Sequence, residues 1–183
     1  MKALINKYKS VIKFIITFIL VYVALSVCYK FYLDFSKDSK YYPDYVTNLV
    51  ARQSKDLIDL MGYKAEVLPH PDEPSMKLII NNKYLARITE GCNSVSVIIL
   101  FVSFIIAFSG KPKTTFMYIL AGSVLIYSVN LIRIVFFSIS LYHYPWRKDI
   151  LHTVIFPAII YGMVFLLWIV WVNRFSNMIR NNE

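Results

Sequence analysis

Cysteine, histidine and glycine are scarce in this 183-residue chain, which contains two cysteines, three histidines and five glycines. Two cysteines are too few to build a framework of disulfide bonds. No Cys/His spacing is typical of a zinc site, and there is no glycine-rich loop that could hold a phosphate group. The sequence therefore excludes disulfide-rich domains, zinc modules and phosphate-loop nucleotide-binding proteins, and we expect no metal and no cofactor.

Charged residues are also few: they make up 17% of the chain, whereas 57% is hydrophobic and the mean hydropathy is +0.53. The apolar residues gather in long runs rather than recurring at period 2 or 3.6, which excludes a soluble domain of this size. Crossing a hydrocarbon core takes about 20 mostly apolar residues, and four runs qualify. We therefore expect an all-α polytopic membrane protein, a single membrane domain over residues 1–183. Its four transmembrane helices are expected at about 11–29, 93–108, 115–141 and 151–172.

Positive charge flanks these runs on one side of the expected membrane, within a net charge of +9. Basic residues precede the first run, separate the second from the third and follow the fourth: Lys2, Lys7, Lys9, Lys13, Lys111, Lys113, Arg174 and Arg180. This positive-inside pattern predicts a multi-pass protein of the cell (inner) membrane with both termini in the cytoplasm. Acidic and basic residues balance between residues 30 and 90, so no basic stripe could track a phosphate backbone. We expect the lipid bilayer, and no nucleic acid, as a partner.

A polar segment, residues 34–90, separates the first two runs and is predicted to lie outside the cytoplasm. Pro43 and Asp44 suit the first turn of a helix, and Gly62 suits its end. Apolar residues recur between them at helical spacing, which predicts an amphipathic helix on the membrane surface or on the helix bundle.

The rest of this segment is predicted to be irregular and then to form a β-hairpin. The irregular part is indicated by three prolines, Pro69, Pro71 and Pro74. Residues 76–80 and 83–88 flank Asn81 and Asn82, and asparagine tolerates the positive φ of a two-residue hairpin turn. The result is a small extracytoplasmic α/β segment between the first two helices. Two interpretations stay open: a solvated loop with minor structure, or a cap over a site.

Arg133 is the only charged side chain deep within any apolar run. A charge at that depth costs several kcal/mol unless it is paired or reaches water, so function is the default hypothesis. Asn130 lies three residues earlier, on the same helical face, where it could hold the guanidinium. A structural arginine that snorkels to the interface is the alternative.

His152 opens the fourth run, and Pro157 follows five residues later. The proline leaves the carbonyl of Thr153 without its helical donor and should bend the first turns. His143 competes as a base but follows the third helix in a tyrosine-rich loop, where interfacial packing is the favoured interpretation. His70 lies between two prolines and is interpreted as a loop residue.

The expected topology brings Cys92, Arg133 and His152 to one depth near the external face. Cys92 begins an inward helix, Arg133 lies near the outer end of an outward helix, and His152 begins the next inward helix. A histidine can take the thiol proton and return it to a leaving amine, and a guanidinium can stabilise a thiolate or an oxyanion. Coincidence is the alternative, given how few polar residues are available. A Cys28–Cys92 disulfide is a minor alternative for the two cysteines, with Cys28 favoured as lipid-facing or core filler.

Three blocks of sequence carry a family resemblance: Glu90-Gly91-Cys92-Asn93-Ser94, Asn130-Leu131-Ile132-Arg133-Ile134, and His152 at the mouth of the last helix. They resemble the signature blocks of the exosortase/archaeosortase family, and the short chain most resembles the exosortase F type of Gram-negative bacteria. The resemblance implies a polytopic membrane cysteine transpeptidase. Its catalytic residues would be Cys92, Arg133 and His152, with Asn130, Gly91 and Asn93 in support. Larger exosortases have more spans, and often a glycine soon after the cysteine, where this chain has Asn93-Ser94.

We therefore expect a membrane cysteine protease/transpeptidase that cleaves a C-terminal sorting segment of secreted proteins through a thioester, with its active site on the extracytoplasmic side. Its partners would be secreted proteins that carry a C-terminal transmembrane sorting tail, with a small associated membrane protein left open. Two rivals remain. One is a non-catalytic scaffold or chaperone of an export or sorting system. The other is a transporter or channel component in which Arg133 binds an anion, although broken helices of the transporter type are not seen.

Overall fold

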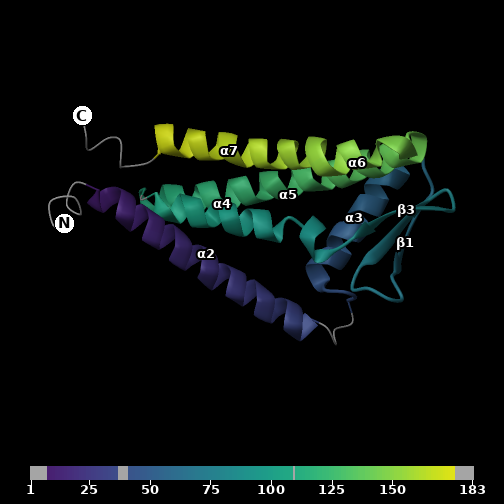
Figure 1. The fold of residues 1–183 in the computed structure, drawn as a ribbon, viewed down its shortest axis with the longest axis horizontal. Helices are drawn as coiled ribbons and strands as arrows, with labels where there is room; N and C mark the ends of the chain where they lie inside the picture. The colour runs from purple at the N-terminus through teal and green to yellow at the C-terminus, as the bar shows by residue number, and fades with distance from the viewer. Residues whose placement is uncertain (1–7, 37–40, 109, 176–183) are drawn as a thin grey trace.

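Long apolar helices run side by side and carry a small sheet at one end (Figure 1). The computed structural model describes residues 8–36, 41–108 and 110–175. Within them, three helical stretches are long and apolar enough to cross a membrane: Lys9–Ser36, Pro112–His143 and Pro145–Arg174. The first is α2 and the second is α5. The third consists of η2 (Pro145–Arg147), α6 (Lys148–Ile150), η3 (Leu151–Ile155) and α7 (Phe156–Arg174).

The second expected span is shorter than predicted. Helix α4 (Val95–Ala107) has 13 residues and follows a separate 3-10 turn, η1 (Glu90–Cys92), with Ser94 as its N-cap and Phe108 as its C-cap. At 1.5 Å per residue it is about 20 Å long, less than the roughly 30 Å of a hydrocarbon core. Of the four transmembrane helices expected, the described residues contain three that are long enough to cross a membrane, and α4 is a shorter apolar helix. The first span also extends beyond its predicted end, since α2 continues to Ser36.

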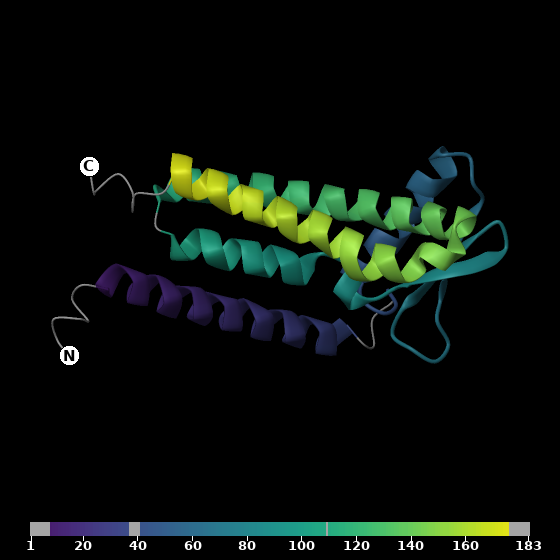
Figure 2. The same ribbon diagram turned by 45° about the horizontal axis from the view of Figure 1, so that its top comes forward.

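The helices pack through a shared apolar core away from the sheet. It joins Phe101 and Ile105 of α4, Ile126 of α5, and Val164 and Trp171 of α7. Gly122 on α5 makes the close approach possible, because a Cβ there would overlap the ring of Phe101. The start of α2, the end of α7 and the α4–α5 connection lie together at one end (Figure 2), so α4 carries the chain back from the sheet to that end.

The polar segment folds as one helix and a three-stranded sheet. Helix α3 (Tyr45–Leu60) is capped by Asp44, whose Oδ1 accepts from the Thr47 backbone N–H at 3.0 Å, and Gly62 follows it with φ +90°. This confirms the predicted helix. It packs on α5 and the sheet rather than standing apart.

Strands β1 (Ala65–Pro69), β2 (Met76–Ile80) and β3 (Lys83–Ile88) are antiparallel in the order β1-β2-β3. The hairpin is confirmed: Asn81 and Asn82 connect β2 to β3 with φ values of 48° and 62°. Strand β1 was missed, and Pro69 ends it instead of lying in irregular chain. A proline is tolerated there because β1 is an edge strand and needs no donor on its free side.

The insert is anchored to the membrane helices by its own core. Leu78, Ile80 and Ile88 of the sheet are at most 2% exposed and belong to a cluster that includes Ile134 and Val135 of α5. The insert is thus fixed against the C-terminal half of α5.

A polar contact joins α3 to β1 within the insert. The carboxylate of Asp59 accepts from Lys55 at 2.6 Å and from the backbone N–H of Ala65 at 2.7 Å. These two bonds hold the pKa of Asp59 below its usual range.

Candidate active site

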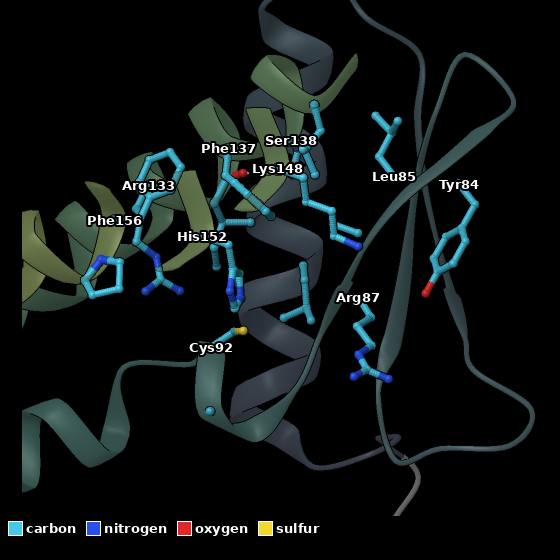
Figure 3. A pocket seen from close by; sticks show the side chains of 16 residues that line it. Tyr84, Leu85, Arg87, Cys92, Arg133, Phe137, Ser138, Lys148, His152 and Phe156 are labelled. Atoms are coloured by element: carbon cyan, nitrogen blue, oxygen red, sulfur yellow. Dashed lines mark hydrogen bonds between the residues drawn. The ribbon is translucent and has the colours of Figure 1, made fainter. Parts of the chain in front are cut away.

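A cavity of about 770 Å³ lies between β3 and η1 on one side and α5, α6, η3 and α7 on the other. Cys92, Arg133 and His152 all line it, and Figure 3 shows the three side chains turned towards the same space. They come from three separate elements of the chain, η1, α5 and η3. The structure therefore brings the three predicted site residues together.

Cys92 ends η1 and is a free thiol with a partly buried side chain. Two hydrogen bonds fix it. The Thr89 hydroxyl donates to Sγ at 3.7 Å, and the Asn130 amide donates to the Cys92 carbonyl oxygen at 2.7 Å. Asn130 is 2% exposed, so its partner matters to the stability of the fold as well as to the thiol. The sequence placed Asn130 beside Arg133; the structure places its amide on the backbone of Cys92.

Asn93 supports the site from behind and does not line the cavity. It is fully buried. Its Nδ2 donates to the Tyr29 hydroxyl at 2.8 Å and to Thr47 Oγ1 at 3.1 Å, while its Oδ1 accepts from the Val95 N–H at 3.0 Å. One side chain thereby joins α2, α3 and the start of α4 directly behind the cysteine.

Gly91 does line the cavity, next to Cys92. A Cβ built there meets only Thr89 Oγ1, at 3.7 Å, which is ordinary contact. The described structure therefore has room for a larger side chain at this position. The glycine leaves open space in the cavity beside the thiol.

Arg133 is half-buried on α5. Within residues 8–36, 41–108 and 110–175, no carboxylate forms an ion pair with it. Its guanidinium is therefore available to an anionic group that enters the cavity.

His152 lies at the rim of the cavity, exposed, with its ring centroid 5.8 Å from that of Phe137. It belongs to η3, a π-helical turn in which the Phe156 N–H reaches back to the Leu151 carbonyl. The disturbance predicted from Pro157 is present as this π-turn, because proline has no N–H with which to continue the α-helical ladder. No hydrogen bond joins the histidine to Cys92 among the described residues, as is common in enzymes without substrate.

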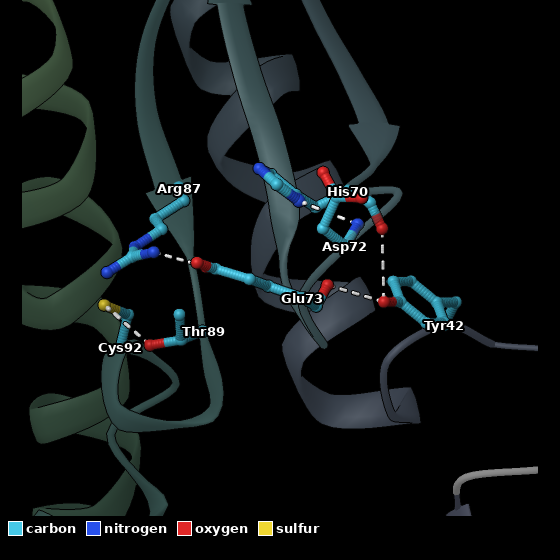
Figure 4. A network of polar contacts seen from close by, with 7 residues as sticks. All are labelled: Tyr42, His70, Asp72, Glu73, Arg87, Thr89 and Cys92. Carbon is cyan, nitrogen blue, oxygen red and sulfur yellow. Dashed lines mark hydrogen bonds and ion pairs between the residues drawn. The ribbon is translucent and has the colours of Figure 1, made fainter.

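Other residues of the cavity wall were not foreseen from the sequence. Arg87 of β3 is held by an ion pair with the carboxylate of Glu73, and the Glu73 carbonyl accepts from the Tyr42 hydroxyl at 2.5 Å (Figure 4). Lys148 of α6 lines the cavity from the other side. No periodic pattern marks Arg87 or Lys148. Thr89 offered one weak signal, a hydroxyl three residues before the cysteine.

The remaining candidates lie outside the cavity. His143 Nε2 is 2.8 Å from the Tyr63 hydroxyl, in the expected aromatic packing. The His70 ring accepts from the Asp72 N–H in a loop. Cys28 is an exposed free thiol on α2, so the described structure has no Cys28–Cys92 disulfide. Among the described residues, no three Cys, His, Asp or Glu side chains gather as metal ligands.

The fold and cavity define a helical membrane protein that presents a cysteine, an arginine and a histidine to one cavity beside a small sheet. The model of one protein family, the transmembrane exosortases (Exosortase_EpsH), matches residues 9–173. The chain therefore belongs to the transmembrane exosortase family. No curated protein and no solved structure matches it.

Proposed function

We propose that this chain is a membrane-embedded cysteine peptidase or transpeptidase that cleaves a C-terminal sorting segment of secreted proteins. The observation that supports it most is the one cavity lined by Cys92, Arg133 and His152. Membership of the exosortase family adds the membrane setting and a secreted substrate that carries a sorting signal.

The reaction begins when His152 takes the thiol proton and Cys92 Sγ attacks the carbonyl carbon of the scissile peptide bond. A C–S bond forms, and the carbonyl oxygen becomes an oxyanion that the Arg133 guanidinium stabilises. The C–N bond then breaks, and the imidazolium gives its proton to the departing amine. Water or an acceptor amine, deprotonated by His152, attacks the thioester and releases the thiol.

Supporting residues act on the geometry of this step. Asn130 holds the Cys92 carbonyl, Asn93 locks the chain immediately after it, and Gly91 leaves room for the substrate backbone. We assign all three as positioning residues, since the side chains of Asn130 and Asn93 bond to the chain itself and Gly91 has no side chain.

We further propose that the chain crosses the inner membrane four times, with both termini in the cytoplasm and the cavity on the extracytoplasmic side. The positive flanks support this orientation. Helix α5 starts at the end where α2 starts, so the chain must return between them, and α4 makes that return (Figure 1). The short chain and its three sequence blocks favour the exosortase F type.

The main rival is a non-catalytic scaffold or chaperone of a sorting system. In that case the thiol is dispensable and Arg133 matters only for insertion. A transporter that binds an anion at Arg133 is a weaker rival. Both rivals predict that Cys92 can be replaced without loss of function.

The deciding experiment compares Cys92→Ala with the matched variant Cys28→Ala in cells that express tagged secreted proteins with C-terminal membrane tails. Loss of tail cleavage is expected for Cys92→Ala, whereas Cys28→Ala should cleave like wild type because its thiol is outside the cavity. His152→Gln should slow cleavage by about 10²-fold or more, as expected for loss of a general base. Unchanged cleavage in Cys92→Ala would refute the peptidase.

A further inference from the structure

Strand β3 is an edge strand whose free edge faces the cavity. The sheet order is β1-β2-β3, and β3 pairs only with β2. Five consecutive residues of β3, Tyr84 to Ile88, line the cavity. Side chains of a strand alternate between its two faces, so a cavity against one face would be lined by every second residue. An unbroken series indicates that the cavity runs along the edge.

The free edge of β3 carries backbone N–H and C=O groups that have no partner in the sheet. In an antiparallel pair, an edge strand turns every second N–H and C=O away from its neighbour. Within the described residues, no helix, turn or side chain forms a hydrogen bond to the backbone of residues 83–88 from that side. The cavity is therefore bordered by unpaired peptide donors and acceptors.

A β-bulge marks the middle of this edge. Leu78 pairs with Ala86 and Ile79 with Tyr84, which leaves Leu85 as the extra residue. Bulges bend an edge strand and interrupt regular pairing, and they occur often beside active sites. The bulge thus hinders pairing of the whole edge with a strand of another chain. The part after the bulge, Ala86 to Ile88, stays regular and can still pair.

The same strand leads to the nucleophile. Ile88 is buried at its end, and the next residue, Thr89, accepts from the Cys92 N–H through its carbonyl at 2.8 Å. A peptide lying along β3 would reach the cavity space shared by Cys92 and Arg133 without leaving the edge (Figure 3).

We propose that the segment of the substrate immediately before the scissile bond binds in extended form along β3, as a fourth strand of the sheet. The proposal rests on the proposed function and names how that site holds its peptide. The body of the substrate is outside and its tail enters the bilayer, so the segment runs in the same direction as β3, which descends from the outer hairpin to Cys92. Main-chain hydrogen bonds then hold many sequences in one register, and side chains against Arg133 and Phe137 select among them.

Disulfide cross-linking in membranes tests this arrangement. The full-length chain carries Cys28→Ser and Cys92→Ala, with either Ala86→Cys or Arg87→Cys added. The probe is a tagged reporter whose tail is cut in a Cys92-dependent manner, with a single cysteine at each of six successive positions before the cut. Ala86 and Arg87 are neighbours on opposite faces of β3, so cross-linking should alternate along the reporter, with opposite parity for the two variants.

Strand β1 provides the matched control, because it is the other edge of the same sheet. Glu66→Cys lies on its exposed face and should give no cross-link above background. Cross-links at every third or fourth reporter position would indicate a helical substrate and overturn the proposal. Equal yields at all positions, or from Glu66→Cys, would overturn it as well. If no reporter tail is cut in a Cys92-dependent manner, the proposed function itself fails, which is a separate result.

Discussion

The environment of Cys92 is set by residues that hold it rather than by residues that react. Its carbonyl, its sulfur and the residue after it are each bound by a different side chain, from Asn130, Thr89 and Thr47. Such fixation would serve the nucleophile that we propose, since small displacements from the attacking geometry cost large factors in rate. Thr89 is the most informative of the three, because its hydroxyl is the only hydrogen-bonding group on Sγ among the described residues.

Replacing Thr89 by valine keeps the shape of the side chain but removes the hydrogen bond to Sγ, so the thiolate form of Cys92 should become less stable. A hydrogen bond to a charged group contributes about 1.5–3 kcal/mol, so we expect tail cleavage, and alkylation of Cys92 by a water-soluble thiol reagent, to slow by about tenfold or more. Thr89→Ser keeps the hydroxyl and should remain within about twofold of wild type. Equal alkylation rates in the valine and serine variants would show that the hydroxyl does not act on the sulfur.

At the scale of the elements, Cys92 and His152 both lie in turns that depart from regular α-helix. Cys92 ends the 3-10 turn η1 before α4, and His152 lies in the π-turn η3 before α7. Inserting or removing one residue in a helix turns the following side chains by about 100°. The irregular turns therefore set the direction in which each side chain points, and Pro157 enforces the second of them.

Pro157→Ala should restore the missing N–H and let residues 151–155 return to an α-helix. His152 would then turn away from the cavity. We expect kcat for tail cleavage to fall by about 10²-fold, as for loss of general-base catalysis, with KM little changed and thermal stability kept or increased. Pro112→Ala is the control, because Pro112 occupies the first turn of α5, where no helical N–H is needed. Full activity of Pro157→Ala would contradict the prediction that the π-turn sets the direction in which His152 points.

Local signals predicted some elements well and left others hidden. Asn81-Asn82 between two apolar runs specifies its own turn, and Asp44 and Gly62 specify the ends of α3, so these could be found from sequence. Strand β1 could not, because its exposed Leu68 and terminal Pro69 match no alternating pattern, and only pairing with β2 makes it a strand. The position of Arg87 in the cavity wall could not be predicted for a similar reason, because its partner Glu73 comes from a separate loop.

The shared cavity was predictable because topology, not packing, decides it. In the expected topology, Cys92 begins one helix, Arg133 lies in the C-terminal half of the next and His152 begins the one after it, so all three lie towards the same end of the helices. Packing decides the finer arrangement. It directs the Asn130 amide to the Cys92 carbonyl rather than to Arg133, and no spacing rule could distinguish the two.

Across the whole molecule, unequal helix lengths determine how deep the cavity would lie in the bilayer under the proposed orientation. Helix α5 has 32 residues, about 48 Å, and its outer part packs into the core of the insert through Ile134 and Val135. Helix α4 is only about 20 Å long, and Cys92 contacts α5 at Asn130, about 27 Å from the start of α5. If α5 starts at the inner boundary of a hydrocarbon core of roughly 30 Å, as the proposed orientation requires, Cys92 lies near the outer boundary, where the tail of the proposed substrate would leave the bilayer.

This arrangement predicts opposite accessibility for the two ends of the molecule. In a Cys28→Ser, Cys92→Ser background, Tyr84→Cys on β3 should react with a membrane-impermeant maleimide applied from the extracytoplasmic side. Asn173→Cys, near the end of α7, should react only after the membrane is permeabilised. Both positions are exposed, so burial does not distinguish them, and neither change removes a flanking positive charge that sets orientation. Labelling of Asn173→Cys from outside would invert the proposed orientation, and labelling of both from one side would mean that α4 does not cross.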